Sequence, residues 1–177
     1  MCPGGQVIAA ASEAGGVCTN GMSVYARDGQ NANAALLVDV RTQDFPDAHP
    51  LSGLTLQRQW ERAAFAAGGG DYRAPAQRVE DFLHDRASRA LGEVTPTYRP
   101  GVPPADLRAV LPAYAAAGLK DGIQIFACQL RGFDHPDAVL TGVEARSSSP
   151  LRIPRDEGLQ SSVRGLYPAG EGAGFAG

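Results

Sequence analysis

Lysine is nearly missing from this chain. Lys120 is the single lysine among 16 basic residues, and 19 acidic residues bring the formal net charge of the 177 residues to −3. The arginines are spread along the sequence, whereas a nucleic-acid-binding surface requires clustered positive charge, so we expect no nucleic-acid partner. The bias toward arginine is typical of a GC-rich coding sequence, and a single arginine therefore needs independent support before an anion is assigned to it.

Cysteine and histidine are also scarce, with three of each. They form no Cys-x-x-Cys or Cys/His pattern, so we predict no metal site and no disulfide framework. This cysteine usage favours a reducing, cytoplasmic location. We expect surface positions for His49, His84 and His135, and core positions for Cys18 and Cys128.

Long hydrophobic runs are absent as well. No charged segment followed by an apolar stretch opens the chain, and the apolar runs fall well short of the ~20 residues that a membrane span needs. We therefore expect neither export nor insertion into a membrane.

Residues 1–45 are predicted to be mainly β. Two short apolar segments, 6–12 and 17–19, are separated by turn-forming residues, and Asn20-Gly21 is a strong hairpin signal, so a β-hairpin is predicted. A further strand is predicted over the valine- and leucine-rich residues 34–41.

Residues 52–132 change to helical periodicity. A helix is predicted from Ser52 to Ala67, because apolar side chains recur at helical spacing and three glycines follow. Val79, Phe82 and Leu83 form the apolar face of a shorter helix. The proline-rich residues 95–104 must be extended, and a helix interrupted by Pro112 is predicted over residues 107–130.

β character returns over residues 138–157, where strands are predicted at 138–146 and 151–153. Strands before and after a helical middle suggest a helical insertion carried by a sheet domain. The fold class is therefore predicted to be α/β, with α+β character within these 177 residues.

The last residues, 165–177, predict a short buried strand that runs into a glycine-rich turn with one acid, Glu171. Such a turn lets backbone N–H groups approach a ligand closely, and the acid can accept hydrogen bonds from a sugar-like hydroxyl. This pattern is typical of dinucleotide binding, although a flexible glycine-rich terminus gives the same pattern. No helix follows the turn, so we expect the chain to be a piece of a larger protein.

Several separated motifs resemble the C-terminal part of the uncharacterised FAD-dependent dehydrogenases, a family of NAD(P)/FAD-dependent oxidoreductases. The resemblance extends over essentially the whole chain. The motifs are Met1-Cys2-Pro3-Gly4-Gly5, Thr19-Asn20-Gly21-Met22-Ser23, Ala26-Arg27-Asp28-Gly29, Pro75-Ala76-Gln77-Arg78-Val79, Leu140-Thr141-Gly142-Val143-Glu144, Ser148-Ser149-Pro150 with Arg152, and the closing residues 165–177.

The resemblance implies an FAD-binding Rossmann-like domain with an inserted β-rich and helical domain. Residues 1–162 would then form the inserted, substrate-side domain, and residues 163–177 the return strand and glycine-rich turn of the FAD domain. The family's first FAD element, a strand with a G-x-G-x-x-G turn and a helix, is absent from these residues. We therefore expect FAD to be the cofactor of the intact parent, and these residues alone to bind it weakly or not at all.

The resemblance also implies the cofactor-binding residues. An acid at the end of the last sheet strand holds the ribityl chain in related flavoproteins, and Glu171 stands at the matching position. The other residues predicted to contact the flavin are Gly170, Gly172, Ala173 and Gly174.

Weaker candidates lie in the segment before the tail. Arg146, Ser148 and Ser149 could present a positive charge and hydroxyls to the flavin's pyrimidine edge, or could belong to a strand edge capped by a serine turn. Arg152 and Arg155 stand beside Asp156 and Glu157, so surface pairing competes with a ligand role.

Cys2 is the one weak catalytic candidate. It precedes Pro3-Gly4-Gly5, which would form a rigid turn able to line a substrate pocket. A lone cysteine without a resolving partner is more often a small buried side chain, so both interpretations stay open.

The function implied is a fragment of an FAD-dependent oxidoreductase that is inactive by itself. Hydride transfer through the flavin of the intact parent would act on a small-molecule substrate that the sequence does not name, with NADH or NADPH as candidate electron donors. The alternative hypothesis is a stand-alone, non-catalytic α/β binding or structural module whose glycine-rich tail is disordered.

Overall fold

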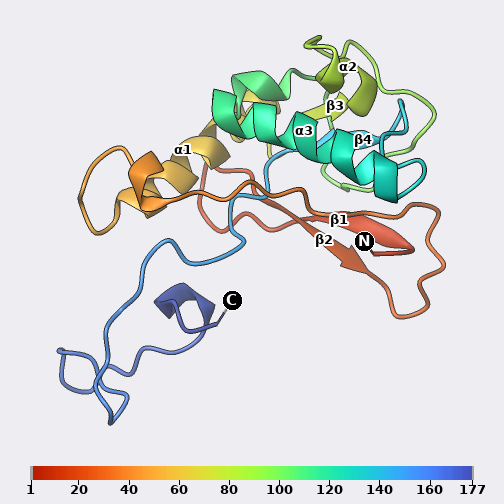
Figure 1. Ribbon diagram of the computed structural model, residues 1–177. Helices are drawn as coiled ribbons and strands as arrows, with labels where there is room; N and C mark the ends of the chain where they lie inside the picture. The colour runs from red at the N-terminus through yellow and green to blue at the C-terminus, as the bar shows by residue number, and fades with distance from the viewer. Residues whose placement is uncertain (1, 177) are drawn as a thin grey trace. The chain divides into compact units, whose positions relative to one another are not determined.

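The computed structural model describes residues 2–176 (Figure 1). Two compact units make up the chain. The first combines the described residues of Met1–Asp39 with Trp60–Glu144, and the second combines Val40–Gln59 with those of Ala145–Gly177. Helix α1, Ser52–Ala67, contributes residues to both units.

The first unit begins with a β-hairpin. Strands β1 (Gly5–Ala9) and β2 (Thr19–Ser23) pair antiparallel, with Gly5 opposite Ser23 and Ala9 opposite Thr19. The predicted hairpin is confirmed, but Asn20-Gly21 lies within β2 and the connection is the longer segment 10–18. The dipeptide is therefore part of the ladder and not its turn.

The strand predicted over residues 34–41 is not formed. The chain instead approaches the hairpin at Asn33, whose backbone pairs with Cys2 in an isolated bridge and whose side-chain amide donates to the carbonyl of Gln6 at 2.7 Å. This amide fills the space that Gly5 leaves, because a Cβ at Gly5 would lie 2.6 Å from the Asn33 Cγ atom. With no neighbouring strand to pair with, the apolar residues after Asn33 stay irregular.

Helix α1 has the predicted bounds. It ends where Gly68 meets the chain returning toward β3, since a Cβ at Gly68 would lie 1.9 Å from the carbonyl oxygen of Arg73. Only glycine permits this close approach of two backbone segments.

The remaining elements of the first unit surround one apolar core. They are β3 (Ala76–Arg78), α2 (Val79–Leu83), the 3-10 turn η2 (Leu107–Ala109), α3 (Ala113–Gln129) and β4 (Val139–Thr141). Strands β3 and β4 lie side by side (Figure 1) and pair antiparallel. Gln77 is opposite Leu140 in this pair. The buried members of the core are Val79, Phe82, Leu107, Ala116 and Ile123. The short helix α2 agrees with the sequence-based prediction, and so does the break between η2 and α3. Strand β3 was not predicted.

The second unit is less regular. It contains the 3-10 turn η1 (Thr42–Asp44), the first half of α1 and the 3-10 turn η3 (Glu171–Ala173). Gly53 allows close packing here, since its Cβ would lie 2.6 Å from the Pro150 Cβ atom. The Gln57 amide donates to the carbonyl of Ala145 at 3.1 Å and joins the helix to the C-terminal segment.

The fold class is α+β, with two small two-stranded antiparallel sheets and few helices among residues 2–176. The strand predicted over 138–146 is shortened to β4, and the one over 151–153 is not formed. Residues 163–170 also carry no strand, because a strand needs a partner and no described residue supplies one. No helix within the described residues is long and apolar enough to cross a membrane.

Candidate cofactor-contacting loop

The glycine-rich loop 170–174 is a defined turn. Its backbone is closed by hydrogen bonds from the Gly174 N–H to the Glu171 carbonyl (2.8 Å) and from the Phe175 N–H to the Gly170 carbonyl (3.0 Å). Gly170 and Gly174 have φ of 75° and 80°, in the region that favours glycine. A Cβ at Gly174 would also lie 2.6 Å from the carbonyl oxygen of Leu151, so both glycines are required by the turn itself.

Gly172 differs from its neighbours. Its φ lies outside the left-handed region, and a Cβ built on it would meet no described atom within 4 Å. The fold of the described residues therefore has no need for glycine at this position. The missing side chain leaves the exposed backbone of the loop open to a ligand.

The loop lies against residues 149–153. The Ser149 hydroxyl contacts the carbonyls of Leu151 (2.8 Å) and Gly172 (3.2 Å), and the Ile153 N–H donates to the Ala173 carbonyl at 3.1 Å. Two groups of predicted site residues, Ser149 and the loop, are thus brought together.

The other predicted site residues differ in their exposure. Ser148 is exposed and forms no hydrogen bond within residues 2–176, and Arg146 is half-buried. Glu171 is exposed, so its carboxylate is accessible as a hydrogen-bond acceptor. The roles of these residues toward a flavin stay predictions.

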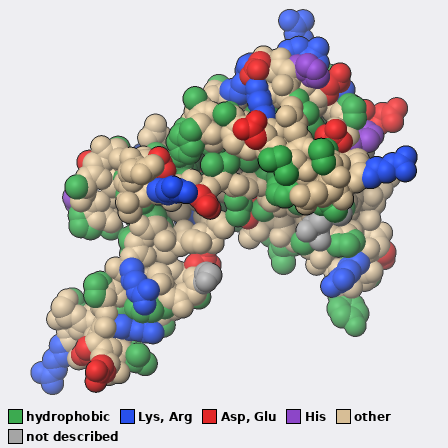
Figure 2. All heavy atoms as spheres, in the orientation of Figure 1, with side chains coloured by type: hydrophobic (Ala, Val, Ile, Leu, Met, Phe, Trp, Pro, Cys, Tyr) green, Lys and Arg blue, Asp and Glu red, His purple; other side chains and the backbone are tan. Residues whose placement is uncertain are grey.

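Arg152 and Arg155 share one aromatic ring. Their guanidinium carbons lie 4.3 Å and 3.6 Å from the centroid of the Phe175 ring, within the range of cation–π contact. The Arg155 Nη1 atom also donates to the Pro168 carbonyl at 2.7 Å. Figure 2 shows basic side chains on the surface of the C-terminal segment, to which both arginines belong.

The surface pairing of these arginines with Asp156 and Glu157 is not found. No ion pair joins Arg152 or Arg155 to a carboxylate within residues 2–176. The Asp156 carboxylate instead accepts from the Gln160 N–H at 3.0 Å and holds a local turn. A short-range backbone partner has displaced the expected salt bridge.

Cys2 lies in the first unit, half-buried, and its backbone N–H donates to the Asn33 carbonyl at 2.7 Å. The position therefore helps to hold the segment before β1, and the reactivity of the thiol stays a prediction. Cys18 is buried as expected, but Cys128 is exposed on α3, so its predicted core position is wrong. The three histidines are exposed, as predicted.

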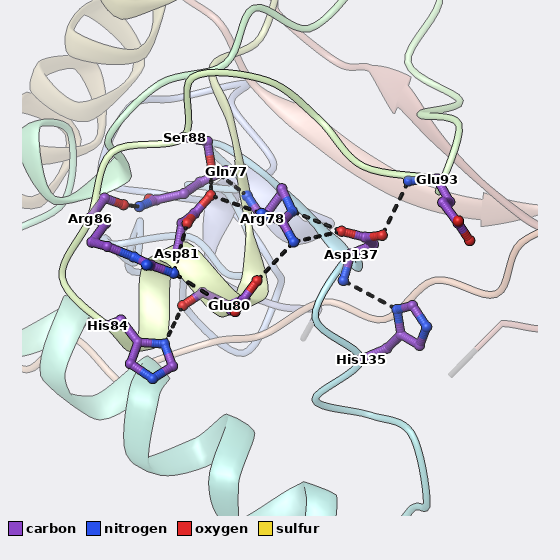
Figure 3. A network of polar contacts seen from close by, with 10 residues as sticks. All are labelled: Gln77, Arg78, Glu80, Asp81, His84, Arg86, Ser88, Glu93, His135 and Asp137. Atoms are coloured by element: carbon purple, nitrogen blue, oxygen red, sulfur yellow. Dashed lines mark hydrogen bonds and ion pairs between the residues drawn. The ribbon is translucent and has the colours of Figure 1, made fainter.

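A polar network that the sequence analysis missed lies in the first unit (Figure 3). One member is Gln77, whose fully buried side chain accepts from the Leu107 N–H at 2.8 Å and donates to the Arg86 carbonyl at 2.6 Å. Gln77 stands in the motif Pro75-Ala76-Gln77-Arg78-Val79. The role of this residue is to satisfy two backbone groups of the interior.

Arg78 extends the network toward the surface. Its guanidinium donates to Asp137 and Glu80, each at 2.8 Å, and lies 3.6 Å from Asp81. The N–H of Glu93, with Arg78, lowers the pKa of the Asp137 carboxyl below its usual range. Each of these carboxylates has a protein partner, so the network is structural, and no cluster of metal ligands exists among the described residues.

A second ionic cluster contains Lys120, the single lysine of the sequence. Lys120 pairs with Asp85, and Arg108 pairs with both Asp85 (3.0 Å) and Asp106 (2.6 Å). Hydrogen bonds from these cations lower the pKa of the Asp85 carboxyl. The cluster connects the end of α2 to η2 and α3 and needs no ligand.

The pKa of the Glu144 carboxyl is shifted in the opposite direction from those of Asp85 and Asp137. It is half-buried, and burial raises the pKa of its carboxyl above the ordinary value. It forms no hydrogen bond or ion pair within the described residues. Its ionised form is therefore disfavoured by the fold.

Comparison with known proteins relates this chain to an FAD-dependent protein family. Residues 1–147 match a family model described as "FAD-dependent protein, C-terminal domain-like". The match covers well over half of the chain, and the chain belongs to this family. The predicted resemblance is confirmed at this level, an FAD-dependent protein family.

The match ends before the glycine-rich loop. A relative from Clostridium beijerinckii (strain ATCC 51743 / NCIMB 8052), named only as an uncharacterised protein, is 52% identical over 178 residues and spans the loop as well. The alignment covers 100% of this chain and 33% of the relative. The chain therefore spans about a third of the length of the curated relative that it matches.

Proposed function

We propose that the chain is the C-terminal part of an FAD-dependent oxidoreductase, and that its glycine-rich loop contacts the flavin. Residues 1–162 would form a substrate-side domain inserted in a Rossmann-like FAD domain, to which residues 163–177 return. FAD, when bound, supplies hydride chemistry that no side chain can provide. The family of the chain and the greater length of its relative support this proposal.

The observation that carries the proposal is the open position at Gly172. Gly170 and Gly174 are required by the turn, but nothing in the described residues requires glycine between them. A glycine that the fold does not need is expected where a ligand approaches the backbone closely. The flat face of a flavin ring is a ligand of that kind.

Glu171 is given the second role in this proposal. Its exposed carboxylate accepts hydrogen bonds from a hydroxyl of the ribityl chain, which positions the cofactor against the loop. The weaker candidates Arg146, Ser148 and Ser149 would face the pyrimidine edge, where positive charge and donors favour reduced flavin.

The proposal also includes an electron donor and a substrate. NADH or NADPH is the proposed donor and a small molecule the proposed substrate, and Cys2 stays a candidate for the lining of the substrate pocket. These 177 residues by themselves would bind FAD weakly, because the family's first FAD element, a strand that runs through a G-x-G-x-x-G turn into a helix and holds the pyrophosphate, is not among them.

Replacement of Glu171 tests the proposal in the complete protein. We expect Glu171→Leu to weaken FAD binding about tenfold or more, because a charge-assisted hydrogen bond is lost. Glu171→Gln keeps a carbonyl acceptor and should restore part of the affinity. The measurement is the fraction of protein that retains visible flavin absorbance after dialysis, with Glu157→Leu as the control for loss of an exposed acid. Equal retention by all variants would contradict the role of Glu171.

A further inference from the structure

Arg152 and Arg155 form a pair, because both make a cation–π contact with the same ring. The Phe175 ring lies 4.3 Å from the Arg152 guanidinium carbon and 3.6 Å from that of Arg155. A cation–π contact holds a guanidinium through the ring and uses none of its N–H groups as hydrogen-bond donors to another residue. The ring therefore fixes two forks of donors without using them.

The charge of the pair is not neutralised within residues 2–176. No carboxylate lies within ion-pair distance of either guanidinium, and Asp156 is engaged by the Gln160 N–H. In the first unit, by contrast, Arg78 and Arg108 each pair with several carboxylates. Two neighbouring unpaired cations on one ring repel each other, and a bound anion would remove that repulsion.

The donors also remain available. Arg155 uses Nη1 to bind the Pro168 carbonyl at 2.7 Å, which anchors its side chain and leaves the other N–H groups free. Arg152 is exposed and donates no hydrogen bond to residues 2–176. An anion with several oxygens could therefore receive donors from both side chains at once.

The segment that carries both arginines is joined to the glycine-rich loop. The N–H of Ile153, between the two arginines, donates to the Ala173 carbonyl at 3.1 Å and thereby joins their segment to the glycine-rich loop. Cβ atoms at Gly170 and Gly172 would meet no described atom within 4 Å, so this part of the loop is sterically open.

We propose that Arg152 and Arg155, stacked on Phe175, form a phosphate-binding site beside the glycine-rich loop and take the phosphate of a nucleotide. Phosphate suits two guanidinium forks better than a single carboxylate does, because it has more oxygens and a charge that two cations balance. The inference deepens the proposed flavin site and rests on it for the identity of the nucleotide. The phosphate belongs either to FAD or to NADP(H), and the site's chemistry is the same for both.

Titration with inorganic pyrophosphate tests the site without any flavin. We expect the 177-residue chain to bind pyrophosphate saturably in isothermal titration calorimetry, and Arg152→Gln/Arg155→Gln to weaken binding about tenfold or more. The matched control is Arg131→Gln/Arg164→Gln, which removes two exposed arginines and the same charge and should bind as the natural chain does. Thermal unfolding verifies that each variant is folded.

A second variant separates orientation from charge. Phe175→Leu keeps both cations but removes the ring that holds them, so binding should weaken severalfold although the net charge is unchanged. No saturable binding by the natural chain, an unchanged Arg152→Gln/Arg155→Gln variant, or equal weakening in the Arg131→Gln/Arg164→Gln control would each overturn the site.

Nucleotide pairs identify the source of the phosphate. In the complete protein, loss of the preference for FAD over riboflavin in Arg152→Gln/Arg155→Gln assigns the site to FAD. Loss of a preference for NADPH over NADH assigns it to NADP(H), and retention of both preferences contradicts a nucleotide ligand. The pyrophosphate result is independent of flavin contact at Gly172, so failure of this site and failure of the proposed function are distinguishable.

Discussion

Gln77 shows at the scale of one residue how a motif position can serve the fold. Its amide is fully buried and satisfies the Leu107 N–H and the Arg86 carbonyl. These two groups lie 30 and 9 residues away in the sequence. No local pattern could have predicted them, and only the three-dimensional structure explains why a polar side chain occupies the interior.

Gln77→Ala should therefore destabilise the chain by about 1–3 kcal/mol, because it leaves the buried Leu107 N–H and the part-buried Arg86 carbonyl without their partner. The measurement is the free energy of unfolding from urea denaturation. Gln124→Ala, at an exposed position on α3, is the control and should change that free energy by less than about 0.5 kcal/mol. Equal effects of the two substitutions would contradict the role of Gln77.

Glu144 gives a prediction about pH. Burial raises the pKa of its carboxyl in the folded state, so the folded chain binds the proton more tightly than the unfolded chain. Its contribution to stability is present at acid pH, below the unfolded pKa, and is lost as the pH rises through the folded pKa.

Glu144→Gln removes that titration. We expect a higher midpoint of thermal unfolding than in the natural chain at about pH 7, and a gain that disappears at about pH 4. Glu157→Gln, at an exposed glutamate, is the control and should not show this pH-dependent gain. A Glu144→Gln variant that is less stable at neutral pH would show that the carboxylate is stabilised by a contact.

At the scale of the element, the end of α1 depends on one glycine. A Cβ at Gly68 would lie 1.9 Å from the Arg73 carbonyl oxygen, and backbone atoms cannot move aside easily. We expect Gly68→Ala to cost about 1–3 kcal/mol of unfolding free energy, a cost typical of an overpacked interior.

Gly122→Ala, within α3, is the matched control, because its Cβ would have its nearest contact at 4.0 Å, on Phe126. Alanine also has the higher helix propensity, so this variant should be unchanged or slightly more stable. Chemical denaturation of both variants tests the comparison. A stable Gly68→Ala variant would mean that the segment after α1 can move away from the helix.

The elements also show what local sequence could predict. The approximate bounds predicted for helix α1 agree with the structure, because its periodicity and the glycines that end it lie within one segment. The strand over 34–41 was predicted from composition and is not formed. A strand depends on a partner elsewhere in the chain, as in β3 and β4, which pair across 60 residues of sequence with three residues each. Strands this short carry too little pattern to be recognised.

At the scale of the whole molecule, the chain has two units of different regularity. The first contains the apolar core and the ionic networks, and the second contains the glycine-rich loop and its arginines. The loop itself could be predicted from its glycines and from the resemblance. The partnership of Arg152 and Arg155 with Phe175 could not, because the acids beside them in sequence favoured a different pairing.

The chain belongs to an FAD-dependent family and covers 33% of its relative from Clostridium beijerinckii. The proposed function requires that a ligand approach the backbone of the glycine-rich loop closely. Gly172 isolates that claim, because a methyl group there meets no described atom and should leave the fold intact.

The most direct test is the affinity of the complete protein for FAD, measured by fluorescence titration of the apoprotein, with Gly172→Ala and with Gly122→Ala as the control. Both substitutions add one methyl group where the chain has room for it. We predict that Gly172→Ala weakens FAD binding about tenfold or more without lowering the unfolding midpoint of the apoprotein, because the methyl group displaces the cofactor from the backbone. Gly122→Ala should bind as the natural protein does. Unchanged affinity in a folded Gly172→Ala protein would contradict contact between this loop and the flavin.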